Sequence, residues 1–213
     1  MATAMTRRGD PDAGAGPPYH YVVTDIETDG PEPGRNSMRS FASVVMNADG
    51  QIVGQFEGCL AELPGAAPDP ATLAWLQSHA AAWADLTRDP RPAAEVIGPY
   101  VDWLRALPLH AVFVAHPLAF DGFWMDWYLR RFAGLRLSCG PYGGERLFLH
   151  AGLDLASLIM GVAGWEFTDC RREAYPQAWS AGHQHTHRAI DDALGYAHIL
   201  AAVLRQRDET LAR

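Results

Sequence analysis

The chain has 213 residues, which is enough for one domain with a sizeable hydrophobic core. Its 48% hydrophobic and 20% charged residues are ordinary globular values and exclude a disordered or fibrous chain. Asp and Glu number 25 against 17 basic residues, and the formal net charge of −8 disfavours a basic protein that coats nucleic acid by bulk attraction. All 17 basic residues are Arg, which excludes Schiff-base chemistry and a P-loop lysine.

Cysteine usage and hydropathy predict the compartment. Cys59, Cys139 and Cys170 lie far apart and outside any Cys-x-x-Cys pair, which is typical of inert thiols in a reducing environment. No uninterrupted apolar run reaches transmembrane length. We therefore expect a cytoplasmic protein with no membrane partner.

Composition along the chain predicts a single domain. Residues 1–18 are rich in Gly, Pro and Ala and are expected to be a disordered leader, followed by one domain over 19–207 and a tail over 208–213. Strands are expected at 20–27, 40–46, 51–60, 111–115 and 146–150. Helices are expected at 71–83, 93–107, 121–132, 153–162 and 190–206. This order predicts an α/β layered domain.

Two acids interrupt the apolar strand that begins the domain. Asp25 and Glu27 are two residues apart, so on a strand their side chains point to the same face. Neighbouring carboxylates in a buried strand repel each other unless cations pair them. The alternative is that the strand has already ended and both acids are solvated, which these residues alone slightly favour.

A third acid, Asp121, follows the strand at 111–115 and opens an aromatic helix. Taken alone, an Asp in a first helical turn is usually a capping or dipole partner. A fourth acid, Asp192, lies on or beside the inward face of the last helix, while Asp191 lies about 100° around it. A buried acid needs a partner, so Asp192 is a candidate functional residue.

His187 precedes Asp192 by five residues, about 140° around an ideal helix. Both side chains can meet one substrate only if His187 lies in the loop before the helix. The alternative is a solvated histidine in a His-rich loop, since His183 and His185 stand nearby. No cysteine accompanies them, so a zinc site is a minor alternative.

Together, these motifs resemble the DEDDh branch of the DnaQ-like and ribonuclease T-like 3′-5′ exonucleases. The resemblance rests on Asp-x-Glu in the first strand, Phe-Asp at a strand-to-helix junction and His-x-x-x-x-Asp entering the last helix, and it spans about 21–202. The Pro-x-Pro-Gly-x-x-Ser-Met run after the first motif is similar to a bacterial exoribonuclease-like subgroup. The family implies a ribonuclease H-like α/β fold with a five-stranded mixed sheet, its second strand antiparallel, flanked by helices.

The resemblance also implies a role for each motif residue. Asp25, Glu27, Asp121 and Asp192 would hold two divalent ions, Mg²⁺ or Mn²⁺, which hard oxygen ligands select. His187 would be the general base, giving nucleoside 5′-monophosphates from a 3′ end. Family members are often homodimers, so a homodimer is implied by analogy.

Contacts to the nucleic acid are predicted at five further residues. Thr28 and Asp29 could meet the terminal nucleotide through backbone groups, and Met38 and Phe41 could wedge against the last base, although Phe41 is at least as well explained as a core residue. Arg188 could contact a phosphate, and a solvated loop Arg explains it equally well.

One position departs from the family. Pro117 stands where the second motif usually carries Asn, four residues before Asp121, and His116 could substitute for that Asn. The predicted function is a metal-dependent exonuclease of single-stranded nucleic acid, with RNA slightly favoured. The alternatives are a single-stranded DNA exonuclease and a catalytically silent nucleic-acid or nucleotide-binding module on the same fold.

Overall fold

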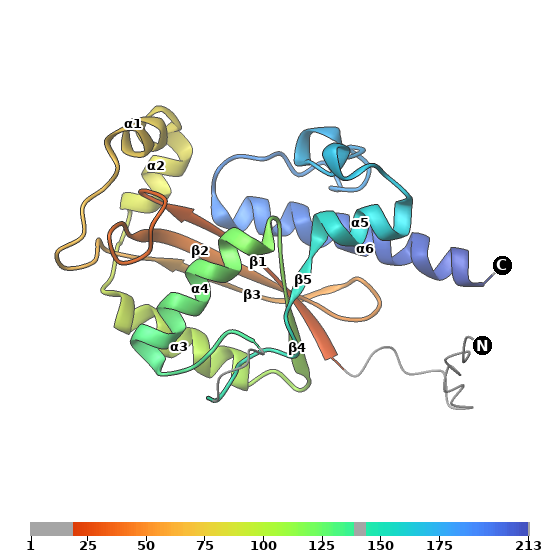
Figure 1. The fold of residues 1–213 in the computed structure, drawn as a ribbon, viewed down its shortest axis with the longest axis horizontal. Coiled ribbons are helices and arrows are strands. Elements are labelled where there is room, and N and C mark those ends of the chain that lie inside the picture. Colours follow the sequence, from red (N-terminus) through yellow and green to blue (C-terminus); the bar gives the residue numbers. More distant parts are fainter. Residues whose placement is uncertain (1–18, 139–143, 213) are drawn as a thin grey trace, which may run out of the picture.

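The computed structural model describes residues 19–138 and 144–212; the predicted leader and Cys139 lie outside them. At its centre is a mixed sheet in the order β3-β2-β1-β4-β5 (Figure 1). The strands are β1 (Tyr19–Thr28), β2 (Met38–Met46), β3 (Ile52–Cys59), β4 (His110–Ala115) and β5 (Leu153–Asp154). β2 runs antiparallel to β1 and β3, while β4 is parallel to β1 and β5. The predicted five-stranded mixed sheet with an antiparallel second strand is confirmed.

Helices cover both faces of this sheet (Figure 1). They are α1 (Pro70–Ser78), α2 (Ala80–Thr87), α3 (Ala93–Arg105), α4 (Leu118–Ala133), α5 (Leu155–Ala163) and α6 (Ala189–Leu211), with short 3₁₀ turns η1 (Phe167–Asp169) and η2 (Arg172–Ala174). Alternation along β1 divides the core: Val22 packs with α3 and α4, whereas Tyr21 and Val23 pack with α5 and α6. Within the described residues, no helix is both long and apolar enough to cross a bilayer.

The helix predicted at 71–83 is two helices, α1 and α2, separated at His79. Ser78 Oγ donates to the Trp75 carbonyl oxygen at 2.6 Å, and His79 Nδ1 lies 2.8 Å from the same atom. These side-chain bonds occupy the last turn and compete with continuation of the helix.

The start of α4 also differs from the prediction. It begins at Leu118, three residues before Asp121, because the Leu118 N–H donates to Asp154 Oδ1 at 3.1 Å. A carboxylate from a distant element therefore satisfies one of the donors that every helix N-terminus exposes.

Two further predictions, one of a strand and one of the C-terminal tail, are wrong. Residues 146–150 contain no strand, only the isolated bridge of Arg136 to Arg146, and the fifth strand is β5. Residues 208–211, predicted as tail, continue α6.

Candidate active site

Asp25 and Glu27 lie deep in the sheet because β1 is flanked by β2 and β4 on both sides. They are 8% and 9% exposed, and their positions in β1 place them on the face that packs against α6. β1 runs on to Thr28. The alternative of two solvated acids past a strand end is therefore wrong.

Asp121 and Asp192 approach the same place from two helices. Asp121 lies in the first turn of α4, is 3% exposed, and its Oδ2 is buried without a hydrogen-bond partner. Asp192, also 3% exposed, lies in the first turn of α6, and one of its carboxylate oxygens is within 4.8 Å of ligand atoms of Asp25 and Glu27. Three elements thus bring together the four predicted acids.

Asp191, the neighbouring acid, faces elsewhere. Its Oδ2 accepts a hydrogen bond from Thr186 Oγ1 at 2.8 Å and lies 3.1 Å from the Arg188 guanidinium. Asp192 accepts the backbone N–H groups of Thr186 and His187 at 3.0 and 3.1 Å. The structure therefore places Asp192, and not Asp191, with the other carboxylates.

Burial and mutual repulsion raise the pKa values of this cluster. Burial is the largest cause in each case: it raises the pKa of Glu27 to about 8, with repulsion from Asp192 and Asp121 adding to it. Burial likewise raises the pKa of Asp121 to about 8. The pKa of Asp25 lies well above its ordinary range, through burial and then the charges of the other three acids.

The carboxylate set passes a chemical test for divalent cations. Asp121 Oδ2 is a buried oxygen with no donor, and Asp25 experiences the charges of the other three acids. His185 Nδ1, 2.9 Å from Asp192 Oδ2, would offset this repulsion only when the histidine is protonated. Hard, charged oxygens of this kind are the ligands that Mg²⁺ and Mn²⁺ prefer. Asp25, Glu27 and Asp192 could hold a metal ion, with Asp121 beside them.

His187 lies at the edge of the cluster, in the loop before α6 as predicted. Its φ of 59° is in the left-handed region, which is uncommon for a residue other than Gly and costs roughly 1–3 kcal/mol. The hydrogen bond from its N–H to Asp192 helps hold this backbone. Burial lowers the pKa of His187, as do the nearby His185 and His79, while Asp192 opposes the shift.

Two of the three aromatic neighbours of His187, Trp75 and His79, escaped the sequence analysis, which named only His185 beside it in the loop. The rings of Trp75, His79 and His185 lie 4.6, 4.7 and 4.3 Å from the His187 ring. Trp75 and His79 belong to the first helical segment after the hairpin, and their spacing of four residues was the one available signal, since it places them on the same side of a helix. Trp75 remains 41% exposed beside the site.

Most of the predicted substrate contacts are occupied within the protein. Met38 and Phe41 are 0% and 1% exposed and belong to the core, as the alternative for Phe41 held. The Asp29 N–H donates to Ser37 O and its carbonyl accepts from Asp69, while Thr28 Oγ1 donates to the Gly30 carbonyl oxygen.

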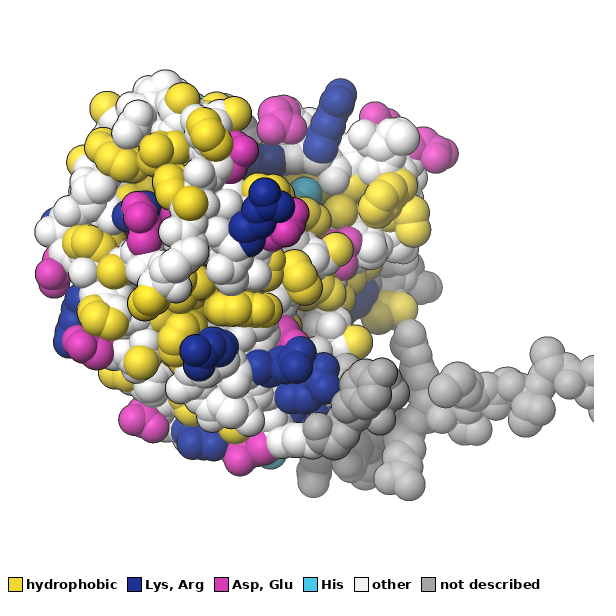
Figure 2. Space-filling model, turned by 60° about the vertical axis from the view of Figure 1, so that its left-hand side comes forward, with side chains coloured by type: hydrophobic (Ala, Val, Ile, Leu, Met, Phe, Trp, Pro, Cys, Tyr) yellow, Lys and Arg dark blue, Asp and Glu magenta, His cyan; other side chains and the backbone are white. Residues whose placement is uncertain are grey.

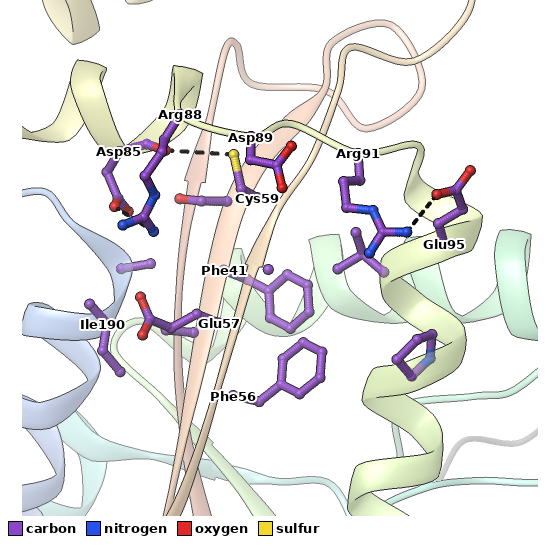
Figure 3. Close-up of a pocket in the computed structure, with 16 residues that line it drawn as sticks. Phe41, Phe56, Glu57, Cys59, Asp85, Arg88, Asp89, Arg91, Glu95 and Ile190 are labelled. Carbon is purple, nitrogen blue, oxygen red and sulfur yellow. Dashed lines mark hydrogen bonds and ion pairs between the residues drawn. The ribbon is translucent and has the colours of Figure 1, made fainter.

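Arg188 is held by two acids. Its guanidinium lies 3.1 Å from Asp191 and 3.5 Å from Asp85, which also lines a groove of about 290 Å³ at the outer edge of β3 (Figure 3). Arg88, on the rim of this groove, pairs with Asp85 as well, at 3.3 Å. These pairs join the groove to the loop that carries His187.

His116, which could substitute for the family Asn, is already in contact with two tyrosines. Its Nε2 lies 2.6 Å from the Tyr175 hydroxyl, and its ring stacks on Tyr196 at 5.1 Å. Pro117 is the N-terminal cap of α4, so its position serves to start the helix that carries Asp121.

Comparison with solved structures finds the same fold among nucleases. The nuclease domain of 3′hExo, described as a DEDDh family member bound to rAMP, has 12% identity and a TM-score of 0.65 over 87% of this chain and 92% of that one. E. coli exonuclease I in complex with a dT13 oligonucleotide has 12% identity and a TM-score of 0.68 over 91% of this chain and 43% of that one.

The exonuclease I of Methylocaldum szegediense gives 17% identity and a TM-score of 0.65, over 91% of this chain and 42% of that one. This chain has the fold of the DEDDh 3′-exonucleases. It spans less than half of the two exonuclease I chains. No protein-family model matches the sequence, and no curated protein matches it. The bacterial subgroup suggested by the Pro-x-Pro-Gly run stays a prediction.

Proposed function

We propose that the protein is a 3′-5′ exonuclease that hydrolyses single-stranded nucleic acid with the help of two Mg²⁺ or Mn²⁺ ions and releases nucleoside 5′-monophosphates. One observation carries the proposal: four carboxylates from β1, α4 and α6 are buried together beside an imidazole. Such a costly arrangement of like charges is typical of a site that works with bound cations.

Asp25, Glu27, Asp121 and Asp192 would be the ligands in this mechanism. When bound, two such ions activate a water and stabilise the leaving 3′-oxygen. Asp192 has a second task, because its hydrogen bonds to the Thr186 and His187 N–H groups fix the loop that carries the base.

His187 would take the proton of the attacking water. Its lowered pKa keeps the imidazole neutral near pH 7, the form that accepts a proton. The ring packs against Trp75 and His79, which limits the directions it can face. The left-handed backbone at His187 supports a role in function, since strain of this kind is kept where a side chain has to be aimed.

RNA is proposed as the preferred substrate over DNA. This chain covers 92% of the 3′hExo nuclease domain, whose structure holds rAMP, but only 43% of exonuclease I, whose structure holds dT13. The predicted contacts of the Thr28 and Asp29 backbone with the terminal nucleotide, and of Arg188 with a phosphate, belong to the same proposal. The homodimer stays a prediction.

An assay with 5′-end-labelled single-stranded RNA and DNA of the same sequence tests the function. We expect stepwise shortening from the 3′ end with Mg²⁺ or Mn²⁺, abolished by chelator, and faster on RNA. Glu27→Gln should be inactive, whereas Glu57→Gln, an exposed acid on β3, is the matched control and should retain activity. If neither polymer is cleaved but both bind, the protein is a binding module and the proposal is wrong.

A further inference from the structure

A group of histidines adjoins the carboxylates and offers different donor atoms. His185, His187 and Asp192 each present one ligand atom, and these atoms lie within 4.8 Å of one another. His185 Nδ1 is 2.9 Å from Asp192 Oδ2, and its ring lies 4.3 Å from that of His187. Two imidazole nitrogens and one carboxylate oxygen therefore converge where the other cluster offers oxygen alone.

Hydrogen bonds orient Asp192 within this set and the His79 ring beside it. Asp192 accepts the N–H groups of Thr186 and His187, which fixes its carboxylate. The neighbouring His79 lies with Nδ1 2.8 Å from the Trp75 carbonyl oxygen, so Nδ1 is the donor and the lone pair is on Nε2. Metal-binding histidines in proteins are oriented by the same kind of bond from the second ring nitrogen to a carbonyl.

We propose that His185, His187 and Asp192 form a second binding site, overlapping the carboxylate cluster at Asp192, for a zinc-class transition-metal ion, with His79 as a neighbouring imidazole. Two histidines and one carboxylate, with a water in the fourth position, are an established ligand set for tetrahedral Zn²⁺. Imidazole nitrogen favours Zn²⁺, Cu²⁺ and Ni²⁺, whereas oxygen ligands suit Mg²⁺ and Mn²⁺. The imidazole nitrogens therefore favour Zn²⁺ at this site, while the oxygen ligands favour Mg²⁺ or Mn²⁺ at the carboxylate cluster.

The two sites share Asp192, which links their occupancy. An ion bound by His185 and His187 would occupy the lone pair of His187 and one oxygen of Asp192. His187 could then no longer accept a proton, and that Asp192 oxygen could no longer bind an ion of the carboxylate cluster. Zn²⁺ should therefore inhibit the enzyme at concentrations where Mg²⁺ is in large excess; this consequence alone rests on the proposed function.

Direct measurement of Zn²⁺ binding to the full chain tests the site without any activity. The three variants are Asp25→Asn combined with Glu27→Gln, His185→Gln, and His183→Gln. His183 lies in the same loop but stacks on His198, outside the set, and is the matched control. In competition with a chromophoric zinc chelator, we expect the first variant and His183→Gln to bind Zn²⁺ as the unsubstituted protein does, and His185→Gln to bind at least tenfold more weakly.

The opposite pattern overturns the proposal. If the Asp25/Glu27 double variant loses the Zn²⁺ and His185→Gln keeps it, zinc occupies the carboxylate cluster instead. X-ray absorption at the zinc edge of the unsubstituted protein is a second measurement that needs no variant to fold. Scattering from two or more imidazoles supports the site, and an all-oxygen shell refutes it.

Discussion

Replacing Asp121 with Asn should stabilise the protein in the absence of metal while abolishing its activity. Asn has nearly the same shape as Asp but cannot ionise, so the folded protein no longer has to hold a proton at this buried position. It keeps an oxygen that can accept the backbone hydrogen bonds around this position. Asp121 is well suited to the test because it is 3% exposed and solvent screens it little.

The size of the effect follows from the pKa of Asp121. Burial raises it from an ordinary 3.8 to about 8, so at pH 7 the folded protein keeps a proton that the unfolded chain has released. At 1.36 kcal/mol per pKa unit, the free energy of unfolding is about 4 kcal/mol lower at pH 7 than well below pH 3.8. The raised folded pKa means that stability is complete in acid and is lost as pH rises from about 4 to 8. Asn has no such loss.

Urea unfolding in EDTA at pH 4 and pH 7 measures this difference. At pH 7 the Asn variant should gain up to about 4 kcal/mol, or roughly 8–16 °C in Tm, and at pH 4 less than about 1 kcal/mol. Asp126→Asn is the control on the same helix: Asp126 lies 3.9 Å from Arg130 and from Arg136, so its loss should bring no gain. Equal gains at both pH values, or none at pH 7, would refute the account of the cluster as repelling, desolvated carboxylates.

Three further predictions concern the active site. Asp192→Ala should abolish 3′ shortening while Asp191→Ala, which removes an acid paired with Arg188, should not; the reverse result would mean that the wrong acid was assigned. His187→Gln should lower kcat by roughly 10²–10⁴-fold, because the proposed general base is lost. The variant should keep most of the rise in Tm that Mg²⁺ induces; if that rise is lost, His187 is a metal ligand instead. Because burial, His185 and His79 lower the pKa of His187, activity should fall on the acid side with a midpoint below 6.5, and a midpoint above 6.5 in a pH–rate profile would contradict this.

Elements with long, regular patterns could be predicted from the sequence. The β-branched run of β1, the Asp49-Gly50 turn between β2 and β3, and the apolar stripe of α6 each carry enough local signal. The failures have tertiary or side-chain causes. β5 is only two residues long, and the start of α4 depends on Asp154, which lies far along the chain.

The shared burial of the four acids and the loop position of His187 were predictable because these residues stand at recognisable spacings in or beside apolar segments. Burying charged side chains is unfavourable, yet the sequence places an acid pair in an apolar strand and another acid on an inward helical face. Such departures from ordinary core composition are expected at functional sites. The surroundings of His187 were not predictable in the same way. Trp75 lies in α1 and His79 directly follows that helix, and only the folded chain shows that this ordinary four-residue spacing brings both rings against His187.

The net charge of −8 has to be reconciled with the proposed nucleic-acid substrate. On the face seen in Figure 2, Arg side chains stand in separate groups with acids between them, instead of forming one continuous basic stripe. Four of the 25 acids belong to the carboxylate cluster, and two ions of charge +2 would halve the formal charge to −4. Attraction for a phosphate chain would then be local to the ions and a few Arg residues. An acidic net charge still disfavours a protein that coats nucleic acid along its length, but it is compatible with the proposed enzyme, which would hold one 3′ end.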